Sequence, residues 1–190
     1  MKRIATVTML QLACLIISGQ NFEFQYGGRS LEDGATVTIS AEEDAWGILS
    51  CETNPASNPK NGLMLKILNS PNAEVRAELE IVEQTFVAKM IQWCMGGNCV
   101  MFGNNNYLVK EYTSTGEDQV QFDASDITSK GHLFAKITVT CSLESHFIYV
   151  RFVHGEETSV RGDLNGDGIV DASDVVVLLN IIMGRNNVIN

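Results

Sequence analysis

The chain has 190 residues with a formal net charge of −10, and 45% of its residues are hydrophobic. This hydrophobic content is ample for a folded core, so disorder is not the default expectation, and the length fits one ordinary domain with a short appendage. The acidic balance, with no cluster of Lys and Arg to offset it, argues against a nucleic-acid-binding surface.

The first 19 residues have the pattern of a secretory signal peptide. Lys2 and Arg3 give a positive start, Ile4–Ile17 forms the apolar region, and Ser18 and Gly19 are the small residues near a cleavage point. The apolar region is too short for a membrane span, which needs about 20 residues. The alternative is a hydrophobic first strand or helix of the core. We expect an exported protein, secreted or at the cell surface, with no membrane span.

Residues 20–154 read as short strands separated by Gly, Pro and Asn turns. The expected strands are Phe22–Tyr26, Thr36–Ser40, Leu63–Leu68, Val75–Val82, Phe86–Cys94, Val100–Phe102, Val120–Phe122, Leu133–Cys141 and Phe147–Val153. The pattern predicts a mainly β fold, an antiparallel two-sheet β-sandwich of the immunoglobulin or fibronectin type. A barrel with the same number of strands is the main alternative.

Four cysteines follow the signal peptide, and an even number in an exported protein favours disulfides. Cys94 and Cys99 flank a four-residue turn with strand-like neighbours, which places them within disulfide reach across a hairpin. By elimination Cys51 would pair with Cys141, although sequence alone allows three connectivities. A zinc site is the alternative use of these thiols.

The β domain offers two weak candidate sites for carbohydrate. Glu78, Glu80 and Glu83 could supply a carboxylate pair for glycoside hydrolysis, but charged residues at every second position are typical of a solvated strand face. Trp46 and Tyr107 lie beside loop-like sequence and could stack on a sugar, whereas Trp93 adjoins Cys94 and is expected to pack against the disulfide.

The segment 163–174 has the oxygen spacing of an EF-hand-type calcium loop. Its expected ligands are the side chains at loop positions one, three, five, nine and twelve and the backbone carbonyl at position seven, namely Asp163, Asn165, Asp167, Asp171, Asp174 and Ile169. Gly168 is at position six, where the sharp turn favours a residue without Cβ. Calcium prefers about six to eight oxygen ligands, and crowded carboxylates repel one another without a cation. The alternative is an ordinary Asp/Asn/Gly turn that binds nothing.

The run from Gly162 to Gly168, with Asp171, Asp174 and an apolar helix Val175–Met183 closed by Gly184, resembles one dockerin repeat. Dockerins are small calcium-folded modules of secreted proteins, which bind cohesin receptors in polysaccharide-degrading assemblies. Asp at position twelve, where ordinary EF-hands have Glu, is part of this resemblance. A full dockerin has two repeats, and only one is present here. The positions at which the family contacts cohesin correspond to Ala172, Ser173, Leu179 and Asn180, without the family's usual basic pair.

The helix is apolar on nearly every side, so something must cover it: the β-sandwich, a receptor or a second copy of the chain. The expected organisation is a signal peptide (1–19), a β-sandwich domain (20–154), a linker (155–162), a dockerin-like loop and helix (163–185) and a tail (186–190). The leading hypothesis is a non-catalytic exported protein. Its C-terminal repeat binds Ca²⁺ and docks to a cohesin-like or other surface partner, and its sandwich serves as a spacer or a glycan-binding module. The alternatives are a small polysaccharide-active hydrolase with a dockerin-like tail, and calcium acting as an internal structural clip without docking.

Overall fold

The computed structural model describes residues 21–70, 72–155, 162–165 and 169–183. This part of the chain consists mainly of β-strands, with one α-helix, α1 (Ala172–Ile182), near the C-terminus and one short 3₁₀ turn, η1 (Pro59–Asn61). The expected signal peptide, residues 156–161 of the expected linker and the tail 186–190 lie outside the described residues.

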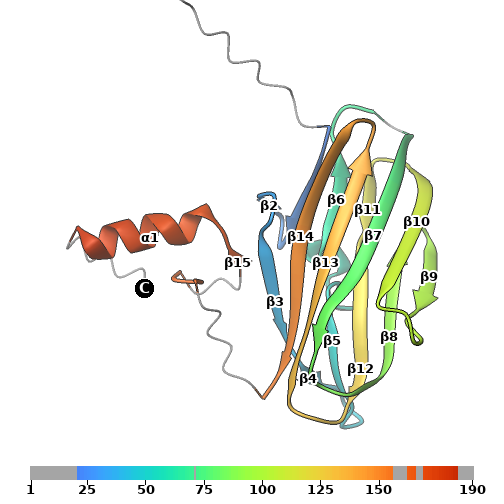
Figure 1. Cartoon of the computed structure of the whole chain (residues 1–190), viewed down its shortest axis with the longest axis vertical. Coiled ribbons are helices and arrows are strands. Elements are labelled where there is room, and N and C mark those ends of the chain that lie inside the picture. Colours follow the sequence, from blue (N-terminus) through green and yellow to red (C-terminus); the bar gives the residue numbers. More distant parts are fainter. Residues whose placement is uncertain (1–20, 71, 156–161, 166–168, 184–190) are drawn as a thin grey trace, which may run out of the picture.

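The largest sheet has six strands and forms one layer of the molecule (Figure 1). In spatial order they are β10 (Tyr107–Ser114), β7 (Ala73–Gln84), β13 (Gly131–Cys141), β14 (Glu144–His154), β3 (Thr36–Ser40) and β15 (Ile169–Val170). Neighbours are antiparallel except β14 and β3, which are parallel. The two-residue strand β15 is the outermost, so residues near the C-terminus extend this sheet beyond β3.

Two smaller sheets form the opposing layer. The first has the order β11 (Glu117–Gln119), β6 (Met64–Ile67), β1 (Phe22–Tyr26) and β2 (Arg29–Leu31). The second has the order β4 (Glu42–Glu43), β5 (Leu49–Glu52), β12 (Gln121–Ile127), β8 (Ala88–Met95) and β9 (Asn98–Met101).

Buried side-chain hydrogen bonds connect these two smaller sheets. Thr53, directly after β5, accepts a hydrogen bond at its hydroxyl from the Phe122 amide (2.7 Å) and donates to the Val120 carbonyl (2.8 Å). The Asn54 side-chain amide donates to the carbonyls of Leu63 (2.9 Å) and Pro59 (3.0 Å). Both residues are buried, and hydrogen bonding removes most of the cost of placing polar groups there.

The core lies between the two layers. Alternate residues of β13 are buried, from Leu133 to Cys141, as expected when one face of a strand packs on the opposing sheet. Phe122 of β12 stacks on Phe152 of β14 with ring centroids 4.8 Å apart, which joins the layers directly. The predicted β-sandwich with a C-terminal loop and helix is therefore confirmed.

Several strands were not predicted from the sequence: β2, β4, β5, β10, β11 and β15. The longest is β10, which pairs with β7 over its full eight residues. Its inward-facing position 110 is a lysine, which weakens the alternating pattern. The Lys110 ammonium hydrogen bonds to the carbonyls of Trp93 (3.0 Å) and Asn98 and lies 4.9 Å from the Trp93 ring centroid. Burial lowers the pKa of Lys110. This side chain links β10 of the largest sheet to β8 and β9 of the opposing layer.

Candidate metal centre and exposed helix

The C-terminal segment is attached to the sandwich through the middle of the expected calcium loop. Ile169 and Val170, at loop positions seven and eight, form β15 and pair with Val37 and Thr36 of β3. The Ile169 side chain is only 4% exposed and belongs to the main hydrophobic core. The loop and the sandwich therefore share a strand pair and a core residue.

The carboxylate of Asp174, at loop position twelve, draws the two ends of the loop together. Its Oδ1 accepts hydrogen bonds from the amides of Leu164 (2.6 Å) and Asn165 (3.2 Å), and its Oδ2 accepts one from the Asp171 amide (2.9 Å). The side chain is 3% exposed. Burial raises the pKa of Asp174, but the backbone amide hydrogen bonds together outweigh burial and the pKa is lowered, so the group stays ionised.

The same residues start the helix. Asp171 is the N-cap of α1 and its side chain accepts from the Ser173 amide (2.7 Å), while Asp174 at the third helical position completes a capping box. The Asn165 amide donates to the Ser173 hydroxyl (2.8 Å), which links loop position three to the first turn of the helix. Two carboxylates at a helix N-terminus also interact favourably with its dipole.

The donor set fits a hard cation. The described loop residues Asp163, Asn165, Asp171 and Asp174 offer only oxygen among their acceptor groups, and Ile169 adds a backbone carbonyl. Backbone amides already take up much of the hydrogen-bonding capacity of the Asp174 carboxylate. Within the described ranges no three His, Cys, Asp or Glu side chains converge on a common point. The remaining expected ligand, Asp167, and its neighbour Gly168 lie outside those ranges.

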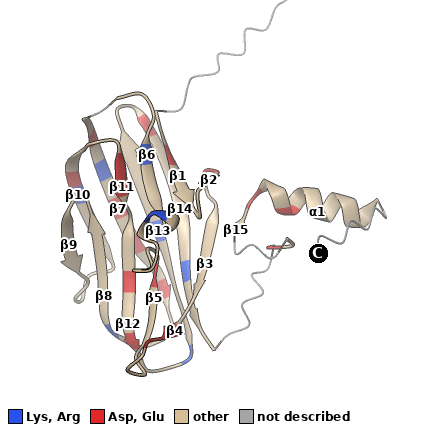
Figure 2. Cartoon of the chain, turned by 180° about the vertical axis from the view of Figure 1, so that it is seen from behind, with Lys and Arg blue, Asp and Glu red and all other residues tan. Residues whose placement is uncertain are grey.

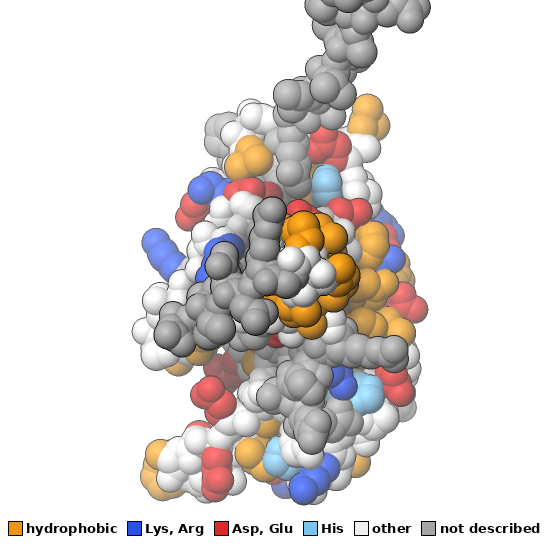
Figure 3. All heavy atoms as spheres, turned by 90° about the vertical axis from the view of Figure 1, so that its left-hand side faces the viewer, with side chains coloured by type: hydrophobic (Ala, Val, Ile, Leu, Met, Phe, Trp, Pro, Cys, Tyr) orange, Lys and Arg blue, Asp and Glu red, His pale blue; other side chains and the backbone are white. Residues whose placement is uncertain are grey.

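The helix leaves most of its apolar side chains in solvent. Those exposed are Val175, Val176, Leu178, Leu179, Ile181, Ile182 and Met183. Figure 3 shows hydrophobic side chains gathered over α1, and Figure 2 shows that the helix carries acidic residues only at its start. The sandwich, one of the three covers considered for this helix, thus leaves these side chains uncovered in the structure.

The candidate carbohydrate residues lie apart from this segment. Tyr107 is half exposed on β10 and donates to Glu78 (2.7 Å), which also pairs with Arg76 (2.8 Å) on the outer face of the largest sheet. Glu80 is exposed on the same face, and Glu83 lies 3.3 Å from the His132 ring. Hydrogen bonds from Tyr107 and Arg76 lower the pKa of Glu78, so this carboxylate is suited to ion pairing rather than to proton donation.

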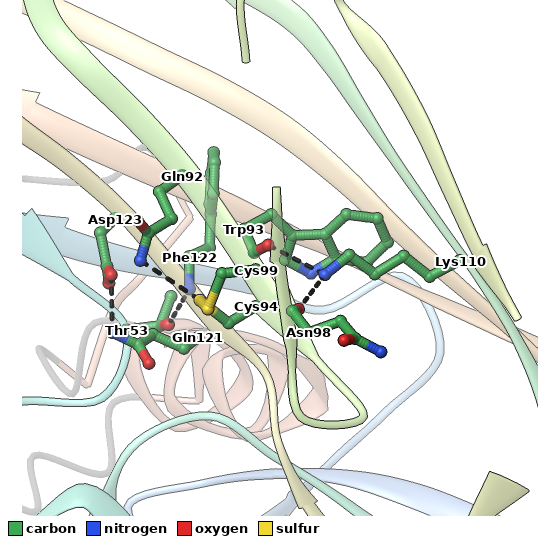
Figure 4. The surroundings of a disulfide bond; sticks show 10 residues. All are labelled: Thr53, Gln92, Trp93, Cys94, Asn98, Cys99, Lys110, Gln121, Phe122 and Asp123. Carbon is green, nitrogen blue, oxygen red and sulfur yellow. Dashed lines mark hydrogen bonds between the residues drawn. A yellow bond between two sulfur atoms is a disulfide. The ribbon is translucent and has the colours of Figure 1, made fainter. Parts of the chain in front are cut away.

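The cysteine predictions are half right. Cys94 and Cys99 form the expected disulfide across the β8–β9 hairpin, with Cα atoms 4.0 Å apart (Figure 4). The pairing of Cys51 with Cys141 is wrong, because both are free, buried thiols, on β5 and β13 of different sheets. Burial is the main cause that raises the pKa of Cys51 to about 12, which makes it a poor nucleophile and metal ligand. Trp93 points away from the disulfide into the core, contrary to expectation (Figure 4).

Asp123 of β12 is a buried carboxylate that the sequence analysis did not single out. Its Oδ2 accepts from the Gln121 amide (2.7 Å), whereas its Oδ1 has no hydrogen-bond partner among the described residues. Burial raises its pKa to about 6, with the Gln121 hydrogen bond acting in the opposite direction and the charge of Glu52 adding to the increase. The expected strand ended at Phe122, so the sequence made no prediction for Asp123.

Replacing Asp123 by asparagine should stabilise the protein at neutral pH. An acid whose folded-state pKa is raised opposes folding above that pKa, so the penalty is present above pH 6 and absent near pH 4. We expect Asp123→Asn to gain about 1–2 kcal/mol in free energy of unfolding at pH 7.5 and about zero at pH 4. Urea denaturation at both pH values measures this difference. Glu80→Gln, on an exposed face, should change neither value. An equal gain at both pH values would show that charge burial is not the cause.

The described residues form a β-sandwich protein with a C-terminal loop and helix. None of the described helices is long and apolar enough to cross a membrane.

No family model and no curated protein matches the sequence. Similar solved structures include the N-terminal domain of PorA, with 17% identity and a TM-score of 0.43 over 70% of this chain and 97% of that one. BslA, a bacterial hydrophobin, has 11% identity and a TM-score of 0.35 over 66% and 97%. A family 123 glycoside hydrolase from Clostridium perfringens has 10% identity and a TM-score of 0.36 over 70% of this chain but 27% of the hydrolase. Likeness at this level gives no evidence on function.

Proposed function

We propose that this chain is an exported, non-catalytic β-sandwich protein whose C-terminal, dockerin-like repeat binds Ca²⁺ and docks to a protein partner, cohesin-like or of another surface type. The sandwich serves as the spacer or binding module that the repeat addresses to this partner, with a glycan as its candidate ligand. The ligand spacing of the loop supports calcium binding, and the exposed position of the helix that follows it supports docking.

The observation that carries the proposal is the closure of the loop around Asp174. A buried carboxylate that holds the amides of positions two, three and nine brings the first ligand positions next to the last one. Asp163, Asn165, the Ile169 carbonyl, Asp171 and Asp174 would hold the ion, together with Asp167. When bound, Ca²⁺ would supply charge neutralisation among these carboxylates and so favour the closed loop over extended conformations.

The helix is suited to docking because it has no charged residue after Asp174 and keeps its apolar side chains exposed. An apolar groove on a receptor would cover the surface that the sandwich leaves open. The loop fixes the direction of the helix through its caps, and β15 anchors the loop to the sandwich. Calcium binding would thereby order the docking surface before the partner arrives.

A second candidate function is favoured by the burial of Ile169. Because this loop residue belongs to the core and β15 extends the largest sheet, calcium could act as an internal clip that stabilises the sandwich, without a partner. Removing calcium with a chelator distinguishes the two candidate functions, because each predicts a different loss. Loss of partner binding supports docking, and loss of sandwich stability alone supports the clip.

Calcium binding is tested by isothermal titration of the full chain. We expect a saturable signal with one site, abolished by Asp163→Ala and unchanged by Glu80→Gln, which removes one exposed carboxylate from the outer face of β7. Asp163 is at loop position one, so its loss removes a charged ligand without altering the Asp174 hydrogen bonds. A chain that gives no saturable heat, or an Asp163→Ala variant that binds as well as the parent, would end the calcium proposal.

Docking is tested by capture of candidate cohesin-like receptors with and without a chelator. The matched variant is Leu179→Asp, which places a charge on the exposed helix surface without touching the loop. We expect recovery to fall at least tenfold in the chelator and in the variant, since a charge in an apolar contact costs more than one order of magnitude in affinity. If the parent with calcium, the parent with chelator and the Leu179→Asp variant recover the receptor equally, docking through α1 is excluded.

A further inference from the structure

An open recess of about 330 Å³ lies beside the disulfide of the β8–β9 hairpin. Its walls include both half-cystines, the glycine turn, β11 and the start of β12, with Cys94, Cys99, Gly97, Glu117, Asp118 and Gln121 among them. A Cβ on Gly97 would meet no atom within 4 Å, so the turn leaves the recess open to solvent. None of the lining residues belongs to the C-terminal segment, so a reaction here is independent of the proposed calcium loop and helix.

The two half-cystines of this disulfide differ in exposure. Cys99 is exposed on β9, the outermost strand of its sheet, whereas Cys94 lies on β8, between β12 and β9, and is 8% exposed. In thiol–disulfide exchange a thiolate attacks one sulfur and expels the other. Exposure therefore directs attack to Cys99 and makes Cys94 the leaving group. The free thiols Cys51 and Cys141 are almost fully buried, so neither competes for an incoming reagent.

A hydrogen-bond donor is already in place for the leaving sulfur. The side-chain amide of Gln92, two residues before Cys94 on β8, donates to the Cys94 Sγ atom at 3.2 Å (Figure 4). Such a bond strengthens when its acceptor becomes charged, so it stabilises a Cys94 thiolate more than the disulfide sulfur. A better stabilised thiolate leaves faster. The donor thus favours the same direction of cleavage as the difference in exposure does.

The charge of the recess selects among thiols. Its wall carries the carboxylates of Glu117 and Asp118, and no Lys, Arg or His is among the described residues that line it. Lys66, outside the lining, lies 3.8 Å from Glu117 and offsets part of its charge, while Asp118 accepts a hydrogen bond from the neutral Tyr112 hydroxyl (3.1 Å). A thiol that also carries a carboxylate is repelled there, whereas an ammonium group on a short stem is attracted.

We propose that the Cys94–Cys99 disulfide is a site of thiol–disulfide exchange with small aminothiols, which attack Cys99 and expel Cys94. The aminothiol, as its thiolate, forms a new S–S bond to Cys99 Sγ while the Cys94–Cys99 bond breaks. The electron pair of the broken bond leaves on Cys94 Sγ, and this thiolate takes a proton from water. The aminothiol sulfur is oxidised and Cys94 is reduced, so the step requires no other oxidant. In the product β9 is no longer covalently joined to β8.

The test treats the full, folded chain with cysteamine at low ionic strength, stops the reaction with iodoacetamide, and maps the modified cysteines by mass spectrometry without reduction. We expect cysteamine on Cys99 and the alkyl group on Cys94, with Cys51 and Cys141 unmodified. The comparison reagent is 3-mercaptopropionate at equal thiolate concentration, which carries a carboxylate in place of the ammonium group. Each rate is divided by the rate of the same reagent with the urea-unfolded chain. On this scale cysteamine should react at least about threefold faster.

Two variants separate the leaving-group effect from the charge effect. Gln92→Leu removes the donor to Cys94 Sγ and should slow the exchange about threefold with both reagents, since a less stabilised thiolate leaves more slowly. Its control is Gln25→Leu, a partly exposed strand glutamine outside the recess, which should leave the rate unchanged. Glu117→Gln/Asp118→Asn should reduce the preference for cysteamine to less than about twofold.

The control for charge removes two carboxylates elsewhere. Glu32→Gln/Glu80→Gln lowers the net negative charge equally on exposed surface outside the recess and should keep the preference for cysteamine. Attachment of cysteamine to Cys94, reaction only after unfolding in urea, or equal normalised rates for the two reagents would each overturn the proposal. An unchanged rate in Gln92→Leu would overturn the role of the Gln92 amide, and an equal loss of preference in both double variants would overturn the role of the recess.

Discussion

Asp174→Ala is expected to unfold α1 and to release β15 from the sheet. The buried carboxylate accepts hydrogen bonds from three backbone amides, so its loss removes these three acceptors and half of the capping box. Each lost hydrogen bond of a buried charged acceptor costs about 1–3 kcal/mol, which exceeds the stability of an isolated 11-residue helix. Far-ultraviolet circular dichroism and hydrogen exchange of residues 169–183 measure the result.

A graded series separates folding from metal binding. Asp174→Asn keeps an oxygen for the Leu164 and Asn165 amides but places an NH₂ group against the Asp171 amide, so we expect an intermediate loss of protection. Asp163→Ala should abolish calcium binding with a much smaller effect on the metal-free helix. If Asp174→Ala keeps the exchange protection of α1, the carboxylate is not what closes the loop.

The alternation of side chains was sufficient to predict the long inner strands, because each of them buries one face. β13 shows this most clearly, with every second residue buried from Gly131 to Cys141. The signal failed for β10, where Lys110 and Tyr112 face inward and reach polar partners at the ends of their side chains. A lysine at an inward position is not distinguishable from a surface lysine without knowing that the Trp93 carbonyl lies above it.

Pairing by elimination failed for Cys51 and Cys141 because an even number of cysteines says nothing about their separation. Cys94 and Cys99 were predictable since a hairpin fixes their distance locally. Cys51 and Cys141 lie on strands whose neighbours are known only from the full topology, and the structure puts them in different sheets.

The oxygen spacing of segment 163–174 predicts a calcium loop, and this stays a prediction, whereas the attachment of the segment to the sandwich could not be predicted from the sequence. A two-residue strand has no periodic signal, and nothing near Ile169 in the sequence indicates that β3 is its neighbour. The loop pattern predicts the Ile169 carbonyl as a calcium ligand. The structure places the Ile169 side chain in the main hydrophobic core of the sandwich.

Ile169→Ala is expected to destabilise the sandwich by about 2 kcal/mol or more, because it creates a cavity at a side chain that is 4% exposed in the main core. The loss has an upper limit. The segment can detach, so the variant cannot be less stable than a chain that ends at Gly155. Urea denaturation followed by the emission of Trp93, which is fully buried between the layers, reports the sandwich itself.

Ile181→Ala is the matched control, since it removes the same atoms from an exposed position of α1. It should leave the sandwich midpoint unchanged, as an exposed apolar side chain makes few contacts to lose. If the loop binds calcium as proposed, the ion should favour the closed loop with Ile169 in the core, and the difference between the two variants should then grow as calcium saturates the parent. Equal midpoints for Ile169→Ala and Ile181→Ala would mean that the segment contributes nothing to the stability of the sandwich, and calcium would then act on the helix alone.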